Sequence, residues 1–146
     1  LDTERGYHVM LPSVEPGLNR SVHFGEEGLM MSPMETGYRV STGVELAGID
    51  ARPDYRRIRR AIGQVSGYVK RLQVDEQSIW MGRRPSPPDS VPYIGEVPGY
   101  PRLFHGFGHG HLGLTGAPMT GRMVAALASG EPPNVDMKPY RIDRFG

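Results

Sequence analysis

The sequence predicts an α+β fold: a mostly antiparallel sheet with one packed helix, followed by strands, a glycine-rich turn and a second helix. Three observations predict it. Short apolar runs separated by glycine and proline fill residues 6–47, as is typical of antiparallel strands. Apolar residues then recur at helical spacing between residues 53 and 72. After residue 78, short strands lead into a glycine-dense stretch and a second helical pattern.

Residues 6–47 are expected to form a meander of strands. A turn with glycine at both ends, Gly25 to Gly28, predicts a hairpin. In the last strand, residues 38–46, apolar and polar residues alternate, which predicts a sheet with Arg39 and Glu45 on a solvated face. The expected strands are residues 6–11, 21–24, 29–31 and 38–46, with a second turn at 33–37.

Residues 53–72 are expected to form a helix that begins near Pro53, a residue suited to a first helical turn. Its apolar stripe predicts packing on the sheet. Arginine and lysine occupy many of the other positions, which suggests nucleic-acid binding as an alternative. Few aromatic residues interleave with these basic ones and the net charge of the chain is only +1, so a solvated basic face is favoured. The stripe consists of Ile58, Ile62, Val65, Val69 and Leu72.

After residue 78 the pattern changes to short strands and proline-rich turns. Residues 79–82 predict a strand, and the four prolines of residues 83–92 predict an extended segment outside any sheet interior. Strands are expected at 93–95 and 103–107, and a helix from Thr115 to Ser129 with Gly130 as its stop. We therefore divide the chain into residues 1–77 and 78–146, expected to pack as one unit.

Composition excludes several classes of protein. The chain has 146 residues and no cysteine, so disulfides, thiolate metal sites and cysteine-linked cofactors are absent. No apolar run is long enough for a membrane span and no signal peptide is visible, so a cytoplasmic location is expected. Gly108, Gly110 and Gly113 match G-x-G-x-x-G, but no apolar strand follows the next helix. A dinucleotide-binding unit needs that strand, so this turn is expected to meet another part of a cofactor.

Two clusters of residues suggest chemistry. Proline after Arg84 restricts that arginine to extended backbone, and a fixed guanidinium suits bidentate capture of a carboxylate. A surface ion pair is the competing reading of Arg84 and remains open at this point. His105, His109 and His111 could be three metal ligands, but their spacing in a glycine turn does not converge and no carboxylate lies beside them in sequence, so no metal is predicted.

The C-terminal residues resemble a known family. Residues 80–95, with Arg83-Arg84-Pro85, residues 103–115 and Thr120-Gly121-Arg122 are similar to the C-terminal part of the FAD-dependent D-amino-acid oxidoreductases. This family groups D-amino-acid dehydrogenase, D-amino-acid oxidase and glycine oxidase. The bacterial D-amino-acid dehydrogenase small subunit is the most similar type, also at residues 4–9, 33–40, 45–50 and 140–145.

The resemblance implies roles for particular residues. Arg84 matches the family arginine that binds the substrate carboxylate, and His111 is implied to lie near the substrate. The family mechanism is hydride transfer from the substrate Cα to FAD, so no residue of this chain is assigned a proton-transfer role. A helix N-terminus facing the flavin would stabilise the negative charge that grows there. The residues implied to contact non-covalent FAD are Gly110, His111, Leu112, Gly113, Leu114 and Thr115.

The resemblance also implies a missing part. The family places its dinucleotide fingerprint in an N-terminal Rossmann half, which this sequence does not supply. We expect a truncated two-domain flavoenzyme: a C-terminal fragment of an FAD-dependent D-amino-acid dehydrogenase, inactive alone and without bound FAD. Its partners would be an amino-acid substrate, the N-terminal FAD-binding half, and other copies through the exposed docking face. The alternative is a non-catalytic binding or interaction module.

The sequence leaves three points open. It does not identify the amino-acid substrate, and it does not distinguish oxygen from a quinone-linked electron acceptor. With a quinone-linked acceptor, the parent enzyme would lie peripherally at the inner membrane. Nor does it choose between a fragment and a natural short protein.

Overall fold

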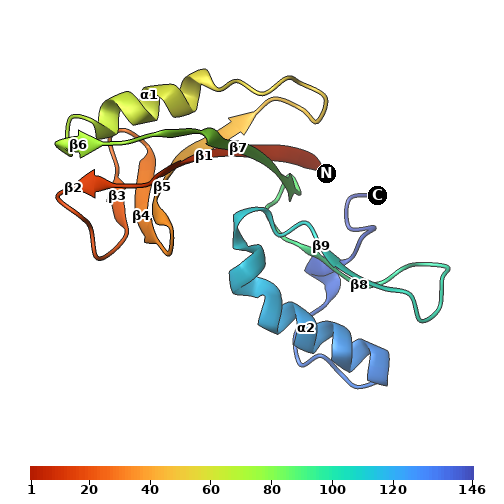
Figure 1. The fold of residues 1–146 in the computed structure, drawn as a ribbon. Helices are drawn as coiled ribbons and strands as arrows, with labels where there is room; N and C mark the ends of the chain where they lie inside the picture. Colours follow the sequence, from red (N-terminus) through yellow and green to blue (C-terminus); the bar gives the residue numbers. More distant parts are fainter. The chain divides into compact units, whose positions relative to one another are not determined.

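A computed structural model describes all 146 residues, which cluster into two compact units (Figure 1). We call residues Arg5–Arg83 the sheet unit, and Leu1–Glu4 together with Arg84–Gly146 the turn unit. The strands are β1 (Asp2–Leu11), β2 (Val14–Glu15), β3 (Val22–Phe24), β4 (Leu29–Met34), β5 (Gly37–Leu46), β6 (Arg71–Leu72), β7 (Asp75–Ser86), β8 (Tyr93–Glu96) and β9 (Phe104–Phe107). The helices are α1 (Arg56–Val65), α2 (Gly113–Ser129) and the 3₁₀ turns η1 (Gly110–Leu112) and η2 (Lys138–Tyr140).

A five-stranded sheet in the order β3-β4-β5-β1-β7 forms most of the sheet unit (Figure 1). The hairpin predicted around Gly25–Gly28 is confirmed, since β3 and β4 pair antiparallel with Val22 opposite Met31. β4 and β5 also pair antiparallel, with Leu29 opposite Thr42. The predicted α+β class, with a mainly antiparallel sheet and few helices, is therefore confirmed.

Helix α1 packs by the predicted apolar stripe. Ile58, Val65 and Val69 are buried, and Ile62 packs partly buried against them. Their partners in the core include alternate residues of β1, which share one face of that strand. The N-cap residue Tyr55 makes no side-chain cap bond, and a single side chain, Asp54, accepts from the first N–H of α1, that of Arg56, at 3.1 Å. Burial of the apolar side chains, at roughly 1.5–3 kcal/mol each, therefore supplies the main stabilisation of this helix.

The end of α1 differs from the prediction of a helix to residue 72. The helix ends at Val65, where the N–H of Gly67 donates to Gln64 O at 3.0 Å and the N–H of Tyr68 to Val65 O at 2.9 Å. The chain then forms β6, which pairs with β2 so that Leu72 lies opposite Val14. Pairing with a strand takes over the backbone hydrogen bonds that a longer helix would have made, while the apolar spacing still buries Val69.

Strand β7 runs further than the predicted residues 79–82. It includes Arg83, Arg84 and Pro85, which the proline content had suggested would leave the sheet. β7 lies at the edge of the sheet. A proline at an edge can direct its missing N–H away from the neighbouring strand, so the ladder is not interrupted.

The solvated polar face predicted for β5 is wrong at Glu45. Its carboxylate lies 3.0 Å from the Nε of Arg5, whose side chain is only 1% exposed, and accepts a hydrogen bond of 2.6 Å from the Tyr7 hydroxyl. The Nε–H of Arg5 is not aligned with that oxygen, so this contact is a charge pair. A buried guanidinium needs a nearby anion, which draws Glu45 inward. Leu46, expected on the covered face, is 77% exposed.

The turn unit combines a hairpin with α2. β8 and β9 pair antiparallel, with Tyr93 opposite Phe107, as the two predicted strands required. α2 begins at Gly113 and buries Met123, and it ends at Ser129. Gly130 then adopts a left-handed φ of 75°, which confirms the predicted stop. Neither α2 nor α1 is long and apolar enough to cross a membrane.

Candidate functional site

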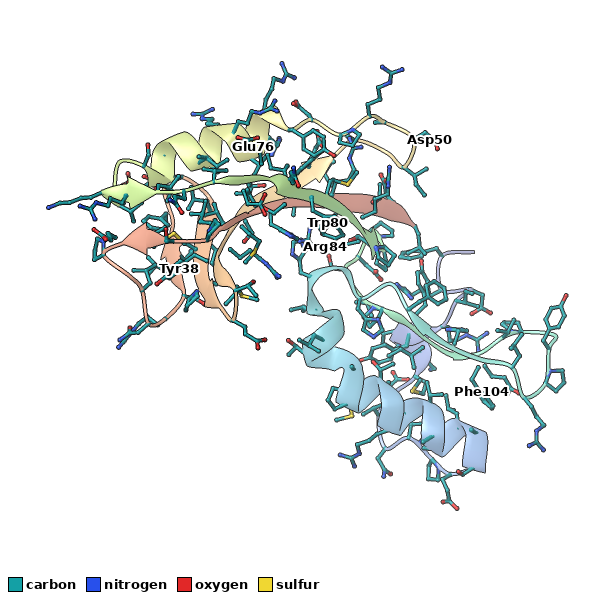
Figure 2. All side chains as sticks on the ribbon, in the orientation of Figure 1. Tyr38, Asp50, Glu76, Trp80, Arg84 and Phe104 are labelled. Atoms are coloured by element: carbon teal, nitrogen blue, oxygen red, sulfur yellow. The ribbon has the colours of Figure 1, made fainter.

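Arg84 lies near the C-terminal end of β7 (Figure 2), and its guanidinium has unused hydrogen-bonding capacity. Its Nη1 atom is buried without a hydrogen-bond partner, and no carboxylate forms an ion pair with it. The preceding Arg83 alternates to the opposite side of β7, where its Nε donates to the Ile49 carbonyl at 3.1 Å. A desolvated guanidinium nitrogen without an acceptor is costly, so Arg84 is suited to receive an anion.

Ser86 and Gly110 extend this part of the turn unit. Ser86 lies two residues after Arg84 and shares its face of the strand, and its hydroxyl oxygen is also buried without a partner. Gly110 has a left-handed φ of 49°, and a methyl group placed on it would lie 3.1 Å from the Ser86 Oγ. The absence of a side chain at Gly110 therefore keeps space beside the unsatisfied hydroxyl of Ser86.

The predicted turn, residues 110–115, contains η1 and the first residues of α2. The Leu112 N–H donates to His109 O at 2.8 Å, which closes the 3₁₀ turn. No side chain caps the start of α2, and its first turn contains no acidic residue. Amides of an uncapped first helical turn lack intrahelical partners and favour electron-rich groups. Leu112 and Leu114 are both exposed here.

The three histidines near this turn have three different environments. His111 Nε2 lies 2.9 Å from Glu4 Oε2, and His109 Nε2 lies 2.8 Å from the Thr120 hydroxyl. Both ring nitrogens of His105 are buried without a partner. No three histidine or carboxylate side chains gather as metal ligands anywhere in the structure. The three imidazoles therefore act separately.

Two residues near the turn were not singled out as binding residues from the sequence. Ser86 could have been found, because it follows Arg84 by two positions in an extended segment, and such residues share a face. Glu4 carried no signal, because its contact with His111 joins opposite ends of the chain. Only the three-dimensional structure brings that carboxylate to the turn.

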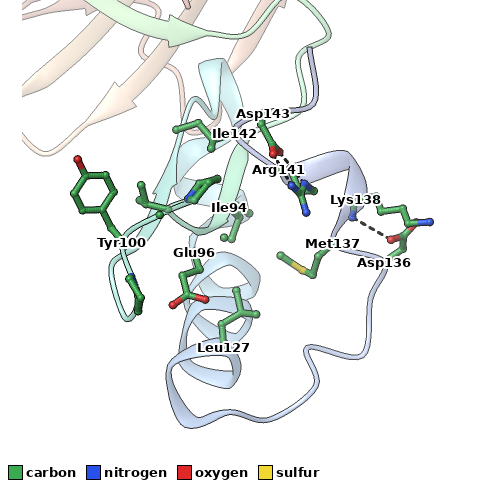
Figure 3. Close-up of a pocket in the computed structure, with 15 residues that line it drawn as sticks. Ile94, Glu96, Tyr100, Leu127, Asp136, Met137, Lys138, Arg141, Ile142 and Asp143 are labelled. Carbon is green, nitrogen blue, oxygen red and sulfur yellow. Dashed lines mark hydrogen bonds and ion pairs between the residues drawn. The ribbon is translucent and has the colours of Figure 1, made fainter. Parts of the chain in front are cut away.

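A cavity of about 550 Å³ lies elsewhere in the turn unit, between the β8–β9 loop and the C-terminal segment (Figure 3). Arg141 and Asp143 pair with each other across 2.5 Å in its wall, and Glu96 accepts a hydrogen bond from the Arg102 backbone. None of the residues that line the cavity holds a buried polar atom without a partner. The unsatisfied donors of Arg84 and Ser86 therefore lie at a different place.

Comparison with known proteins gives a consistent result. Residues 1–127 match the family described as FAD dependent oxidoreductase. The chain is 36% identical to a D-amino-acid oxidase of Bradyrhizobium diazoefficiens, over 99% of this chain and 35% of that protein. It is 35% identical to a D-amino acid dehydrogenase of Paramagnetospirillum magneticum, over 86% of this chain and 30% of that protein.

Among solved structures, glycine oxidase from Geobacillus kaustophilus superposes with a TM-score of 0.80 at 25% identity, covering 97% of this chain and 39% of that one. An L-amino acid deaminase from Proteus vulgaris shares the fold with a TM-score of 0.76 at 22% identity, covering 97% of this chain and 36% of that one. The chain thus spans about a third of the length of the curated relatives it matches.

Proposed function

Because the chain belongs to the FAD dependent oxidoreductase family, we propose that it is the substrate- and flavin-facing part of a D-amino-acid dehydrogenase or oxidase. The observation that carries the proposal is Arg84, whose buried Nη1 has no acceptor. Relatives named D-amino-acid oxidase and D-amino acid dehydrogenase support the substrate class.

Arg84 would bind the substrate carboxylate. Its guanidinium offers a planar pair of donors, and Pro85 keeps the backbone of Arg84 extended. The Ser86 hydroxyl could donate to the same anion, since it lies on the same face and is also unsatisfied. Binding at this end orients the substrate, so these residues act by position and charge rather than by moving a proton.

The turn at residues 110–115 fits the electron-rich edge of a flavin ring. Its uncapped helix start offers backbone donors, and Gly110 leaves room beside Ser86. The backbone of Gly110, His111, Leu112, Gly113, Leu114 and Thr115 would hold that edge without a covalent bond. FAD bound there would supply a hydride acceptor: the substrate would lose a hydride from Cα and a proton from its amino group, and water would hydrolyse the resulting imino acid to a 2-oxo acid and ammonia.

The contacts that bind the rest of FAD would come from another part of the enzyme. α1 leads into β6, which pairs antiparallel with β2, and no strand follows α2. Neither helix therefore forms a phosphate-binding βαβ unit within residues 1–146. We propose that the N-terminal FAD-binding half of the same enzyme is the partner, that the isolated chain does not turn over, and that the whole enzyme acts in the cytoplasm.

Kinetics of Arg84 variants in the complete enzyme test this function. Loss of a desolvated carboxylate contact costs about 2–5 kcal/mol, so Arg84→Ala should raise KM roughly 30-fold or more. Arg84→Lys should recover only part of the loss, because an ammonium lacks the planar fork. Arg83→Ala is the matched control, since Arg83 contacts the Ile49 carbonyl instead. An unchanged KM in Arg84→Ala would remove Arg84 from the site.

A further inference from the structure

His109 joins the turn at residues 110–115 to the body of α2. Its Nε2 lies 2.8 Å from the hydroxyl oxygen of Thr120, in a hydrogen bond whose donor depends on the tautomer of the ring. Thr120 lies about two helical turns after Gly113, the first residue of α2. The carbonyl of His109 also accepts from the Leu112 N–H at 2.8 Å. The side chain and the backbone of one residue thus link η1 to the helix.

The His109 side chain lies along the start of α2. A methyl group placed on Gly113 would lie 3.6 Å from the His109 Cβ, and one placed on Gly116 would lie 3.5 Å from its Cδ2. These are ordinary van der Waals distances. The side chain therefore follows the helix from its first turn toward Thr120, where the ring makes its hydrogen bond.

A cavity of about 210 Å³ adjoins the same turn within the turn unit. Leu112 lines it from η1, Ile94 from β8 and Met123 from α2, and both His109 and Thr120 belong to its wall. Side chains therefore do not fill the space beside the turn, and Leu112 itself is 65% exposed. Close packing usually fixes the position of a segment, so here the hydrogen bond carries more of that task.

We propose that His109 is a positioning residue whose bond to Thr120 holds the backbone amides of residues 110–115 in place relative to α2. The inference rests on the proposed function, in which those amides meet the electron-rich edge of FAD. Donors that are already fixed stabilise a developing negative charge without a cost of reorganisation. His109 would thus act through the turn rather than by touching the substrate.

Amide hydrogen exchange of the 146-residue protein tests this role without cofactor or activity. Leu112 is the reporter, because its N–H donates to the carbonyl of His109. Thr120→Val removes the hydroxyl and keeps a β-branched side chain of nearly the same shape. Loss of one hydrogen bond corresponds to roughly a 3- to 10-fold change, so the Leu112 amide should exchange faster by that factor. The same rate in Thr120→Val and the wild type would overturn the proposal.

Thr120→Ser separates the hydrogen bond from packing. The Thr120 methyl lies beside β9, where a methyl group placed on Gly106 would lie 2.8 Å from it. Serine lacks this methyl and keeps the hydroxyl, so the Leu112 amide should exchange at close to the wild-type rate in Thr120→Ser. If Thr120→Ser accelerates exchange as much as Thr120→Val does, methyl packing holds the turn and the proposal fails.

A double variant tests whether the two residues act through one bond. His109→Phe keeps a ring beside α2 but cannot bond to Thr120, so it should speed exchange by the same factor as Thr120→Val. Combining the two substitutions should then add little. Independent effects would multiply instead, and that outcome would count against the proposal.

Two controls guard against a general loosening of the fold. Thr36→Val is the matched substitution, since Thr36 is exposed in the turn between β4 and β5, and it should leave the exchange of Leu112 unchanged. The Glu131 amide donates to Ala126 O at 2.9 Å at the other end of α2 and should exchange equally in every variant. Faster exchange at Glu131 in Thr120→Val would contradict a local role. Circular dichroism establishes that each variant is folded.

The reduction potential of FAD in the complete enzyme separates this inference from the proposed function. Amides held beside the flavin stabilise the negative charge of its reduced form, so Thr120→Val should lower the potential and Thr120→Ser should not. If Leu112 exchanges faster in Thr120→Val while the potential is unchanged, the proposed contact between the turn and FAD fails and the link from His109 to Thr120 stands. If the exchange is unchanged while Arg84→Ala raises KM, the proposed function stands and this inference fails.

Discussion

The guanidinium carbon of Arg144 lies 3.8 Å from the centre of the Tyr93 ring, so a residue of the C-terminal segment covers the first residue of β8. Arg144 also pairs with Asp89 at 2.9 Å and donates to the Val91 carbonyl at 2.6 Å, and its side chain is 8% exposed. These contacts join the C-terminal segment to residues 89–93 within the turn unit.

Removing Arg144 should destabilise the turn unit. Arg144→Ala deletes a cation–π contact, an ion pair and a hydrogen bond to a carbonyl, which together should cost about 2–3 kcal/mol. Arg144→Lys should lose about half of that, since an ammonium cannot make all three contacts. Urea unfolding checks both variants against Arg122→Ala, which removes an exposed arginine of α2. Equal midpoints for Arg144→Ala and Arg122→Ala would contradict this prediction.

The same pair predicts a pH dependence of stability. Hydrogen bonds from the Arg144 side chain lower the pKa of the Asp89 carboxyl. A carboxyl whose pKa is lower in the folded state stabilises the fold above its unfolded pKa, about 3.9. That stabilisation is lost as pH falls through the folded pKa. Thermal unfolding between pH 6 and pH 2 should show a shallower decline in Arg144→Ala than in the wild type, and parallel declines would argue against the pair.

Two glycines should respond oppositely to alanine. Gly37 has a φ of 126°, and a Cβ there would lie 2.5 Å from the Leu11 carbonyl oxygen, so Gly37→Ala should cost about 2 kcal/mol or more. Gly63 lies inside α1 with open space around it, so Gly63→Ala should stabilise by about 0.5–1 kcal/mol. Denaturant midpoints that move in the same direction would show that this backbone argument fails.

The 146-residue chain on its own should be colourless and should self-associate. A few backbone hydrogen bonds at about 0.5–1.5 kcal/mol each cannot offset the cost of immobilising FAD, about 4 kcal/mol or more. Leu112, Leu114 and Met119 are exposed on η1 and α2, where an apolar surface invites association. Visible absorption checks for bound FAD, and light scattering measures self-association. Leu114→Ser should reduce self-association, with Leu103→Ser as the control. A yellow, monomeric protein would contradict both expectations.

The sequence correctly predicted the features that depend on residues close together in the chain. The Gly25–Gly28 turn has its hairpin, and Ile58 and Val65 lie buried on α1 as their spacing required. Gly130 ends α2 because a glycine adopts a positive φ without the steric cost of a Cβ. Each of these features depends on residues close together in the chain.

Contacts between distant residues account for what the sequence did not predict. α1 stops at Val65 because the following residues pair with β2, more than fifty positions earlier. Glu45 turns inward because Arg5 is buried beside it, which no pattern within β5 indicates. The contact between Glu4 and His111 has the same origin, so the roles assigned to Arg84 and His111 by resemblance stay predictions until variants test them.

The position of Pro85 has a consequence for how copies of this chain can meet. An unpaired sheet edge presents free N–H and C=O groups that can add a strand from another molecule. At β7 that edge carries Pro85, which offers no N–H, beside the charged Arg83 and Arg84, and the opposite edge strand, β3, has only three residues. Both edges are thus poor templates for a foreign strand. Association of this chain should proceed through apolar side chains while leaving the amide hydrogen-exchange pattern of the sheet unchanged.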